Sequence, residues 1–168
     1  MVSGNNKIKI APQLILDIHK ESFGWIFPEW AGRYRTIRVE FSGKEAVLPH
    51  EIPEQIINLC EDLRERLSSI DLNADDYIDM VVELLAWFQH RFVLIHPFQD
   101  YNGRIARMLT VLILLYLNLP PVEIKAETEK DRNNYLESMY AADNGDNSKL
   151  EKLIGNALSE SLSNATKS

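Results

Sequence analysis

The chain has 168 residues, of which 45% are hydrophobic and 26% are charged, a balance typical of ordinary globular proteins. A chain of this length is the size of one domain and can bury a substantial core. The formal net charge of −7 argues against nucleic acid as a general partner, because nucleic-acid binding selects a basic face.

The sequence predicts no disulfide and no membrane segment. Cys60 is the single cysteine, and it shares an apolar helical face with Ile56 and Leu63, which predicts a buried thiol. The segment 1–7 has no apolar core like that of a signal peptide. The longest apolar stretch, 108–119, is shorter than the about 20 residues that span a bilayer. We therefore expect a cytoplasmic protein that does not enter membranes.

Helical periodicity dominates the chain. We expect a first helix over residues 12–22 and a second that begins at Pro53, a residue suited to the first helical turn. A third helix is expected to open at Asn73 as its N-cap. It should end near His96, because the following proline disfavours helical backbone at the residue before it.

The second half of the chain predicts three further helices. The segment 103–118 is apolar nearly all round after its first turn, which predicts a helix surrounded by protein. Thr128 and Ser148 (or Asn147) are the expected caps of two more helices, the last ending near Ser163.

One segment departs from the helical pattern. Residues 36–41 alternate polar and apolar side chains, as a half-exposed strand does. Residues 42–44 have the composition of a turn, and 46–48 would return as a second strand. An isolated hairpin is marginal in water. It is therefore either a plain surface hairpin packed on the bundle or a strand pair that awaits a partner.

The loop between the third and fourth helices, 96–107, reads HPFQDYNGRIAR. The expected helix start at Gly103 leaves backbone N–H groups unpaired, and these favour an anion. Arg104 and Arg107 lie on one face of the first turn, where cations oppose the helix dipole unless a polyphosphate is bound. Asp100 would then hold Mg²⁺, which takes carboxylate and phosphate oxygens together. With His96 as a base, this set suits phosphoryl-type transfer.

This loop resembles the signature HPFx[DE]GNGRxxR of the Fic (filamentation induced by cAMP) family. The segment WAGRYR at 30–35 is similar to the family's WAGxYR segment, and 90–95 is similar to the run before the motif. The resemblance covers about residues 10–160. It implies an all-α fold, a Fic-type helical bundle with a small β-hairpin flap at about 35–48. The whole chain, 1–168, would then be a single Fic domain.

The resemblance implies a protein AMP-transferase that moves AMP from ATP to a Ser, Thr or Tyr hydroxyl of a target protein. His96 would be the general base, and Asp100 would hold Mg²⁺. Phosphate oxygens would be bound by Asn102 and Gly103, by Arg104 near the β-phosphate and by Arg107 at the γ-phosphate. The flap would align a target segment by strand addition, with Ile37, Arg38, Val39 and Val47 as its target-binding residues.

The chain departs from the family pattern at two points. Tyr101 stands where the family usually has Gly, so that either a positive φ there costs about 1–2 kcal/mol or the ring reshapes the nucleotide site. The family's inhibitory pattern [ST]xxxE[GN] is absent, since Phe41 follows the spaced pair Thr36 and Glu40. We expect a separate antitoxin-like protein to inhibit the transferase activity. The alternatives are inhibition within an oligomer or no inhibition.

Other functions remain open on the sequence alone. The same base would serve a transferase that uses another donor, namely another nucleoside triphosphate or CDP-choline. A catalytically silent Fic interaction module, inactivated by Tyr101, is the non-enzyme alternative. A zinc hydrolase is less favoured, because the other histidines show no metal-site spacing.

Overall fold

The computed structural model describes residues 9–166; the segment 1–7, which lacks the apolar core of a signal peptide, lies outside them. Six α-helices and one hairpin follow in this part of the chain. The helices are α1 (Pro12–Phe23), α2 (Ile52–Ser69), α3 (Tyr77–Ile95), α4 (Asn102–Tyr116), α5 (Glu129–Asp143) and α6 (Ser148–Ala165). Strands β1 (Glu40–Phe41) and β2 (Lys44–Glu45) form an antiparallel pair, and a short 3-10 helix η1 (Pro49–Glu51) precedes α2. The expected helical class with a small hairpin is confirmed.

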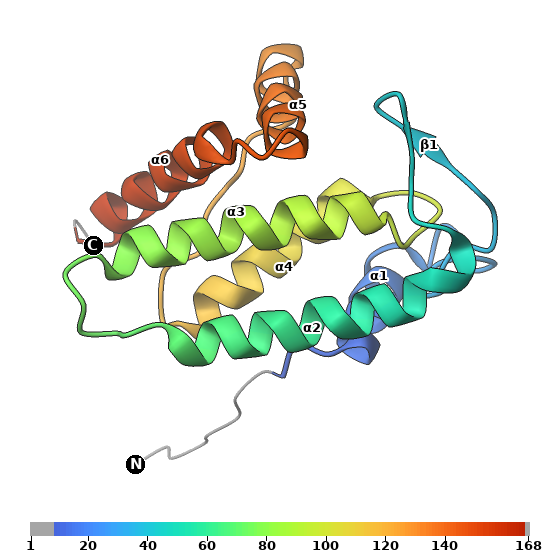
Figure 1. Ribbon diagram of the computed structural model, residues 1–168, viewed down its shortest axis with the longest axis horizontal. Helices are drawn as coiled ribbons and strands as arrows, with labels where there is room; N and C mark the ends of the chain where they lie inside the picture. The colour runs from blue at the N-terminus through green and yellow to red at the C-terminus, as the bar shows by residue number, and fades with distance from the viewer. Residues whose placement is uncertain (1–8, 167–168) are drawn as a thin grey trace.

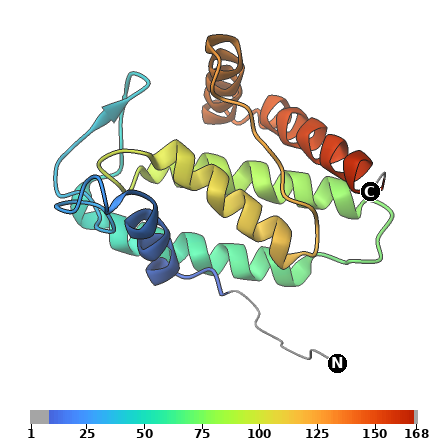
Figure 2. The ribbon, with the colours of Figure 1, turned by 180° about the vertical axis from the view of Figure 1, so that it is seen from behind.

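Helix α3 is the centre of the molecule (Figure 1). It packs against α2, α4, α5 and α6, and its side chains Phe88 and Phe92 are fully buried. Helix α1 packs across α2 and α4, and the reverse view shows the segment after α4 running back over the bundle (Figure 2). The hairpin stands at the end of the bundle where α3 ends and α4 begins. The tertiary structure therefore places the loop 96–101 between α1 and the hairpin.

Most helix ends lie close to their expected positions. Thr128 caps α5, where its hydroxyl accepts the Asp131 N–H at 3.1 Å. The expected N-cap Asn73 of α3 is wrong, because α3 begins at Tyr77 with Asp76 before it. The Asn73 N–H instead donates to the Asp71 carboxylate at 2.9 Å. An aspartate side chain that binds backbone two residues on stabilises a turn and competes with helix formation.

The hairpin is shorter than its alternating pattern predicted. Ser42 and Gly43 form a two-residue turn with φ angles of 52° and 75°, so Lys44 pairs with Phe41 instead of belonging to the turn. The ladder does not extend over 36–39 as a regular strand. The carbonyl of Ile37 accepts a hydrogen bond from the Arg35 side chain at 2.8 Å, which removes it from strand pairing. The Arg35 side chain therefore binds a carbonyl only two residues along the chain, in the segment where the strand was expected.

Helix α4 is not enclosed on all sides, contrary to its apolar composition. Met108 is 41% exposed and Leu115 is 46% exposed. They lie seven residues apart, which places both on one helical face. This face of α4 is therefore partly open to solvent, and Ser22 of α1 approaches it with its Oγ 3.9 Å from the Met108 sulfur.

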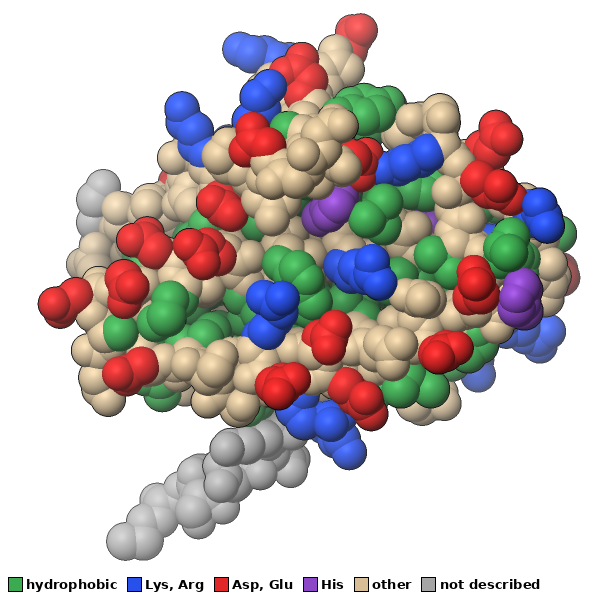
Figure 3. Space-filling model, in the orientation of Figure 1, with side chains coloured by type: hydrophobic (Ala, Val, Ile, Leu, Met, Phe, Trp, Pro, Cys, Tyr) green, Lys and Arg blue, Asp and Glu red, His purple; other side chains and the backbone are tan. Residues whose placement is uncertain are grey.

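The surface view shows carboxylates and cationic side chains interspersed over one face of the molecule (Figure 3). Carboxylates are frequent along the edge formed by α2, and the cations do not merge there into a continuous basic surface. Among the described residues, no helix combines the length and apolar character needed to cross a membrane.

Candidate functional site

His96 ends α3 in a left-handed conformation, with φ 51° and ψ 58°. This geometry follows from Pro97, which disfavours helical backbone at the residue before it. The ring leaves the helix, and its Nδ1 lies 3.3 Å from the carbonyl of Val93. A nitrogen facing a carbonyl must carry the proton, so Nδ1–H donates and Nε2 holds the free lone pair. Nε2 is the atom that can accept a proton.

The hairpin covers one face of His96. The Phe41 ring stacks on the imidazole with a centroid distance of 4.3 Å and an interplanar angle of 12°. Burial lowers the pKa of His96 below its ordinary value of 6.5, and the nearby Arg35 charge lowers it further. The hydrogen bond to Val93 and the Asp100 charge oppose this shift without cancelling it. His96 is therefore neutral, as a base must be, at neutral pH.

We expect Phe41→Ala to raise the pKa of His96 toward 6.5, because water then reaches the imidazole and stabilises its charged form. The titration is followed by NMR of the His96 ring protons. In the wild type the unprotonated ring should persist to lower pH than in the variant. Phe41→Tyr, which keeps an aromatic ring over the imidazole, is the matched control. An unchanged midpoint in Phe41→Ala would contradict the shielding role.

The motif loop is closed by a pair of hydrogen bonds. Phe98 is fully buried, as expected for an apolar side chain in a polar loop. Its backbone N–H donates to Asn102 Oδ1 at 2.9 Å, and Asn102 Nδ2 donates to the Phe98 carbonyl at 2.9 Å. Asn102 is 2% exposed. Its side chain is committed to the loop, so only its backbone N–H can face a ligand.

His19, from α1, connects three segments at the same place. The Gly32 N–H donates to His19 Nδ1 at 2.9 Å. Nε2 must then carry the proton, and it lies 3.3 Å from the Asp100 carbonyl. The imidazole stacks on Phe98 with a centroid distance of 3.8 Å and is fully buried. Burial lowers the pKa of His19, which keeps this ring in the neutral form that both hydrogen bonds require.

Tyr101 adopts the positive φ that its place in the motif requires, with φ 64° and ψ 15°. The unusual backbone angle therefore falls on Tyr101, whereas Gly103 lies inside α4 without a positive φ. The ring stacks on Phe23 at 4.1 Å and lies 5.9 Å from Phe27 and 6.2 Å from Trp30. The Arg104 guanidinium lies over it at 5.2 Å. The ring extends an aromatic cluster at the end of α1 and supports Arg104.

We expect Tyr101→Gly to lower the free energy of unfolding by about 1–2 kcal/mol. Glycine relieves about 1–2 kcal/mol of strain, but it removes a half-buried ring worth about 0.8–1.5 kcal/mol, half the value of a fully buried side chain, and its stacking of about 0.5–1.5 kcal/mol. Glycine also adds about 0.5–1 kcal/mol of chain entropy. Denaturant unfolding measures the difference, with Tyr101→Phe as the control that keeps the ring and should match the wild type. A more stable Tyr101→Gly would show that strain outweighs packing.

Arg104 and Arg107 lie in the first turns of α4, where the backbone N–H groups of residues 102–104 have no helical acceptor. Both line a groove of about 1020 Å³ whose other walls are the segment 122–128 and the start of α5. Arg107 lies over the Tyr135 ring at 5.6 Å, and burial raises the pKa of Tyr135 to about 12. Neither arginine forms an ion pair with a carboxylate of the described residues. Two uncompensated cations beside free amides are an arrangement that favours an anion.

Asp100 is exposed beside this helix start. Its Oδ1 accepts the Tyr101 N–H at 2.6 Å, which orients the carboxylate. Among the described residues, no group of three or more His, Cys, Asp or Glu side chains could hold a metal ion. A single carboxylate fits Mg²⁺ only in the mode in which substrate phosphates and water supply the remaining ligands.

The expected target-binding residues lie on the two arms of the hairpin. Ile37 is 54% exposed, and Arg38 forms an exposed ion pair with Glu45 at 3.2 Å. Val39 and Val47 are half-buried. The carbonyls of Ile37 and Val47 accept hydrogen bonds from Arg35 and are therefore less available to pair with an added strand.

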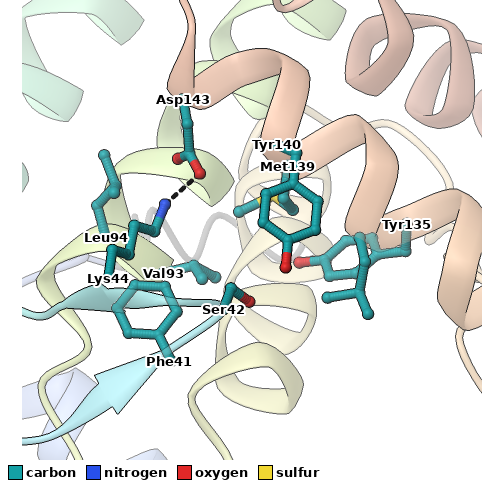
Figure 4. A pocket seen from close by; sticks show the side chains of 10 residues that line it. Phe41, Ser42, Lys44, Val93, Leu94, Tyr135, Met139, Tyr140 and Asp143 are labelled. Atoms are coloured by element: carbon teal, nitrogen blue, oxygen red, sulfur yellow. Dashed lines mark hydrogen bonds and ion pairs between the residues drawn. The ribbon is translucent and has the colours of Figure 1, made fainter.

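A small hollow of about 40 Å³ separates the hairpin from α5 (Figure 4). Phe41, Lys44 and Asp143 line it from opposite sides, and Tyr135 is shared with the larger groove. The Lys44 ammonium points across the hollow to the Asp143 carboxylate, with which it forms an ion pair. His96 is not among the lining residues of either space, and it lies under Phe41 instead.

Sequence reasoning missed several residues of this site. Each of the missed residues contacts a segment that is distant from it in the chain. These residues are His19, Arg35, Phe41, Tyr135 and Asp143. The inward face of the first helix was the one available signal for His19. A buried partner cannot be identified from one segment alone.

Comparisons with known proteins agree with this geometry. A profile of the Fic/DOC family matches residues 9–114. A protein adenylyltransferase Fic from Nematostella vectensis is 35% identical over 132 residues, 79% of this chain and 28% of that protein. The protein adenylyltransferase fic-1 from Caenorhabditis elegans is 33% identical over 132 residues, covering 79% and 24%.

Solved structures give the same result for the fold. A structure of Fic-1 from C. elegans, residues 134–508, superimposes with a TM-score of 0.76 at 28% identity, covering 93% of this chain and 43% of that one. The chain spans about a quarter of the length of the adenylyltransferases it matches, at 28% and 24%.

Proposed function

Because the chain belongs to the Fic/DOC family, matched over residues 9–114, we propose that it is a protein adenylyltransferase. It transfers AMP from ATP to a Ser, Thr or Tyr hydroxyl of a target protein. The observation that carries the proposal is a neutral His96 with Nε2 left as its proton acceptor, at the end of α3 and in the same motif loop as the helix start that presents Arg104 and Arg107. Similarity to proteins named adenylyltransferases supports the same reaction.

His96 acts as the general base. The target oxygen attacks the α-phosphorus of ATP while its proton passes to His96 Nε2. The bond between the α-phosphorus and the oxygen that bridges to the β-phosphate breaks, and pyrophosphate leaves with the electron pair. The products are pyrophosphate and a phosphodiester between AMP and the target. The Nδ1–H bond to Val93 keeps Nε2 as the acceptor throughout.

The phosphates lie at the start of α4. The backbone N–H groups of Asn102 and Gly103 bind their oxygens, Arg104 binds near the β-phosphate and Arg107 binds the γ-phosphate. Tyr101 contributes by supporting Arg104, given the 5.2 Å contact between them. Asp100 would hold Mg²⁺, and the ion would neutralise charge on the phosphate oxygens. The groove of about 1020 Å³ has room for the nucleoside. The cytoplasm, which supplies ATP and Mg²⁺, is the compartment proposed with this activity.

Restraint by a separate protein belongs to the same proposal. Arg107 has no carboxylate partner in the described residues. A glutamate from an inhibitory partner would occupy the γ-phosphate position at Arg107 and compete with ATP. The proposed partner is an antitoxin-like protein that supplies this glutamate.

The test is incubation of the purified protein with Mg²⁺ and ATP labelled at the α-phosphate, in a cell extract. Label on a protein band that depends on His96 supports the proposal. Label that appears only with another nucleoside triphosphate or with CDP-choline would keep His96 as base and replace ATP as donor. No label from any donor would favour a catalytically silent interaction module.

A further inference from the structure

Arg35 is a buried cation that binds backbone alone. It is 4% exposed, and its guanidinium has no carboxylate partner in the described residues. Its Nε donates to the His96 carbonyl at 2.7 Å, and Nη1 donates to the Ile37 carbonyl at 2.8 Å. Nη2 donates to the Val47 carbonyl and lies 3.4 Å from that of Ile95. One side chain thus joins both arms of the hairpin to the base.

This arrangement suits arginine and no other side chain. A buried charge without an ion pair is costly unless hydrogen bonds surround it. Two of the acceptors, Ile95 and His96, are at the C-terminal end of α3, where carbonyls carry partial negative charge. The guanidinium presents donors in a rigid planar fork, so it can hold several carbonyls in fixed directions. A lysine ammonium would reach fewer of them.

The tip of the hairpin has a second attachment. Lys44 forms an ion pair with Asp143 at the end of α5, and His90 Nε2 lies 2.8 Å from the other Asp143 oxygen. Burial raises the pKa of Asp143, but hydrogen bonds from Lys44 and His90 outweigh it and lower the pKa overall. Lys44 also lies 5.1 Å from the centre of the Phe41 ring, which stacks on His96. Figure 4 shows Lys44 directed at Asp143 beside Phe41.

We propose that Arg35 and the Lys44–Asp143 pair are positioning residues that hold the hairpin in register with His96. The inference rests on the proposed function, in which a target strand adds to the hairpin. Strand addition fixes the target to the hairpin backbone, where successive residues are about 3.3 Å apart. A misplacement of about 1 Å can reduce a rate about 100-fold. Neither attachment touches Arg104 or Arg107, so ATP binding is independent of both.

The test compares Arg35→Lys, Lys44→Met and the charge exchange Lys44→Asp with Asp143→Lys. Lys149→Met is the matched control, because it removes an exposed lysine whose 4.0 Å ion pair with Glu137 includes no residue of the hairpin. Three quantities are measured for each protein. They are amide hydrogen exchange of residues 36–47, binding of the fluorescent analogue trinitrophenyl-ATP, and the rate of label transfer against ATP concentration in extract.

We expect faster exchange in the hairpin of both single variants, with analogue binding and the KM for ATP unchanged. The maximal transfer rate should fall about 10-fold for Lys44→Met and about 100-fold for Arg35→Lys. The charge exchange should recover part of the Lys44→Met loss, because it restores the ion pair but not the contact of Asp143 with His90. Unchanged hairpin exchange, or an unchanged transfer rate with faster exchange, would overturn the inference. If Arg35→Lys does not fold, the variants of Lys44 and Asp143 test the inference with the same three measurements. Absence of transfer by the wild type would instead overturn the proposed function, while hairpin exchange still reports on the attachments.

Discussion

His96→Ala is expected to reduce the rate of AMP transfer by about 10²–10⁴-fold, the range that general bases contribute. A protein hydroxyl is a weak nucleophile at neutral pH, and alanine offers no atom to accept its proton. ATP binding should be retained, because the groups proposed to bind the phosphates lie on α4 and His96 lies at the end of α3. The loss should therefore appear in kcat, with the KM for ATP nearly unchanged.

The measurement is label transfer from α-labelled ATP, alongside thermal unfolding of both proteins. His50→Ala is the matched control, since His50 is an exposed histidine in the short helix before α2. It should transfer at the wild-type rate. Transfer by a folded His96→Ala protein at more than about a tenth of the wild-type rate would remove His96 from the role of base.

Arg107→Ala is expected to weaken binding of ATP by about 10²–10³-fold, the effect of deleting one strong contact to a phosphate. The reason is that Arg107 faces the groove without a carboxylate partner among the described residues, so its charge is available to the terminal phosphate. Stability should fall much less, because the substitution removes a guanidinium that has no carboxylate partner among the described residues and whose carbon lies 5.6 Å from the centre of the Tyr135 ring.

The position of the phosphate is tested by comparing ADP with a non-hydrolysable ATP analogue by calorimetry. Arg107→Ala should weaken the ATP analogue and leave ADP nearly unaffected, whereas Arg104→Ala should weaken both. Arg66→Ala is the matched control, because Arg66 also lies over an aromatic ring, that of Trp87 at 4.2 Å, on a different part of the bundle. Equal weakening of both nucleotides by Arg107→Ala would place Arg107 away from the γ-phosphate.

Tyr101 illustrates how a departure from a motif is accommodated. The positive φ at this position favours glycine, and a tyrosine there is strained. The ring of Phe23 and those beside it compensate for that strain by burying the phenol against α1. The chain therefore keeps the geometry of the loop with a different residue. Because its ring lies in this aromatic cluster, Tyr101 is not among the residues that line the groove.

Local sequence determined which segments are helical, where α3 ends and where the motif loop lies. These features depend on hydrophobic period, on proline geometry and on capping groups, all of which act within a few residues. The turn at Asp71 and the short strands escaped prediction for related reasons. An aspartate turn and a helix cap have similar composition, and the Arg35 side chain binds the Ile37 carbonyl inside the segment that alternates like a strand.

Only the tertiary structure decided what holds the base and the loop in place. His19 lies 81 residues from Asp100, and Arg35 lies 61 residues from His96, yet both pairs are joined by hydrogen bonds. No local pattern specifies such a pair, because each side chain could form its hydrogen bonds equally well with water or with another acceptor. Close packing of α1, the hairpin and α3 excludes the water and leaves these side chains one set of partners. The sequence alone identifies the residue types of the motif loop, whereas the distances between these residues depend on how the helices pack.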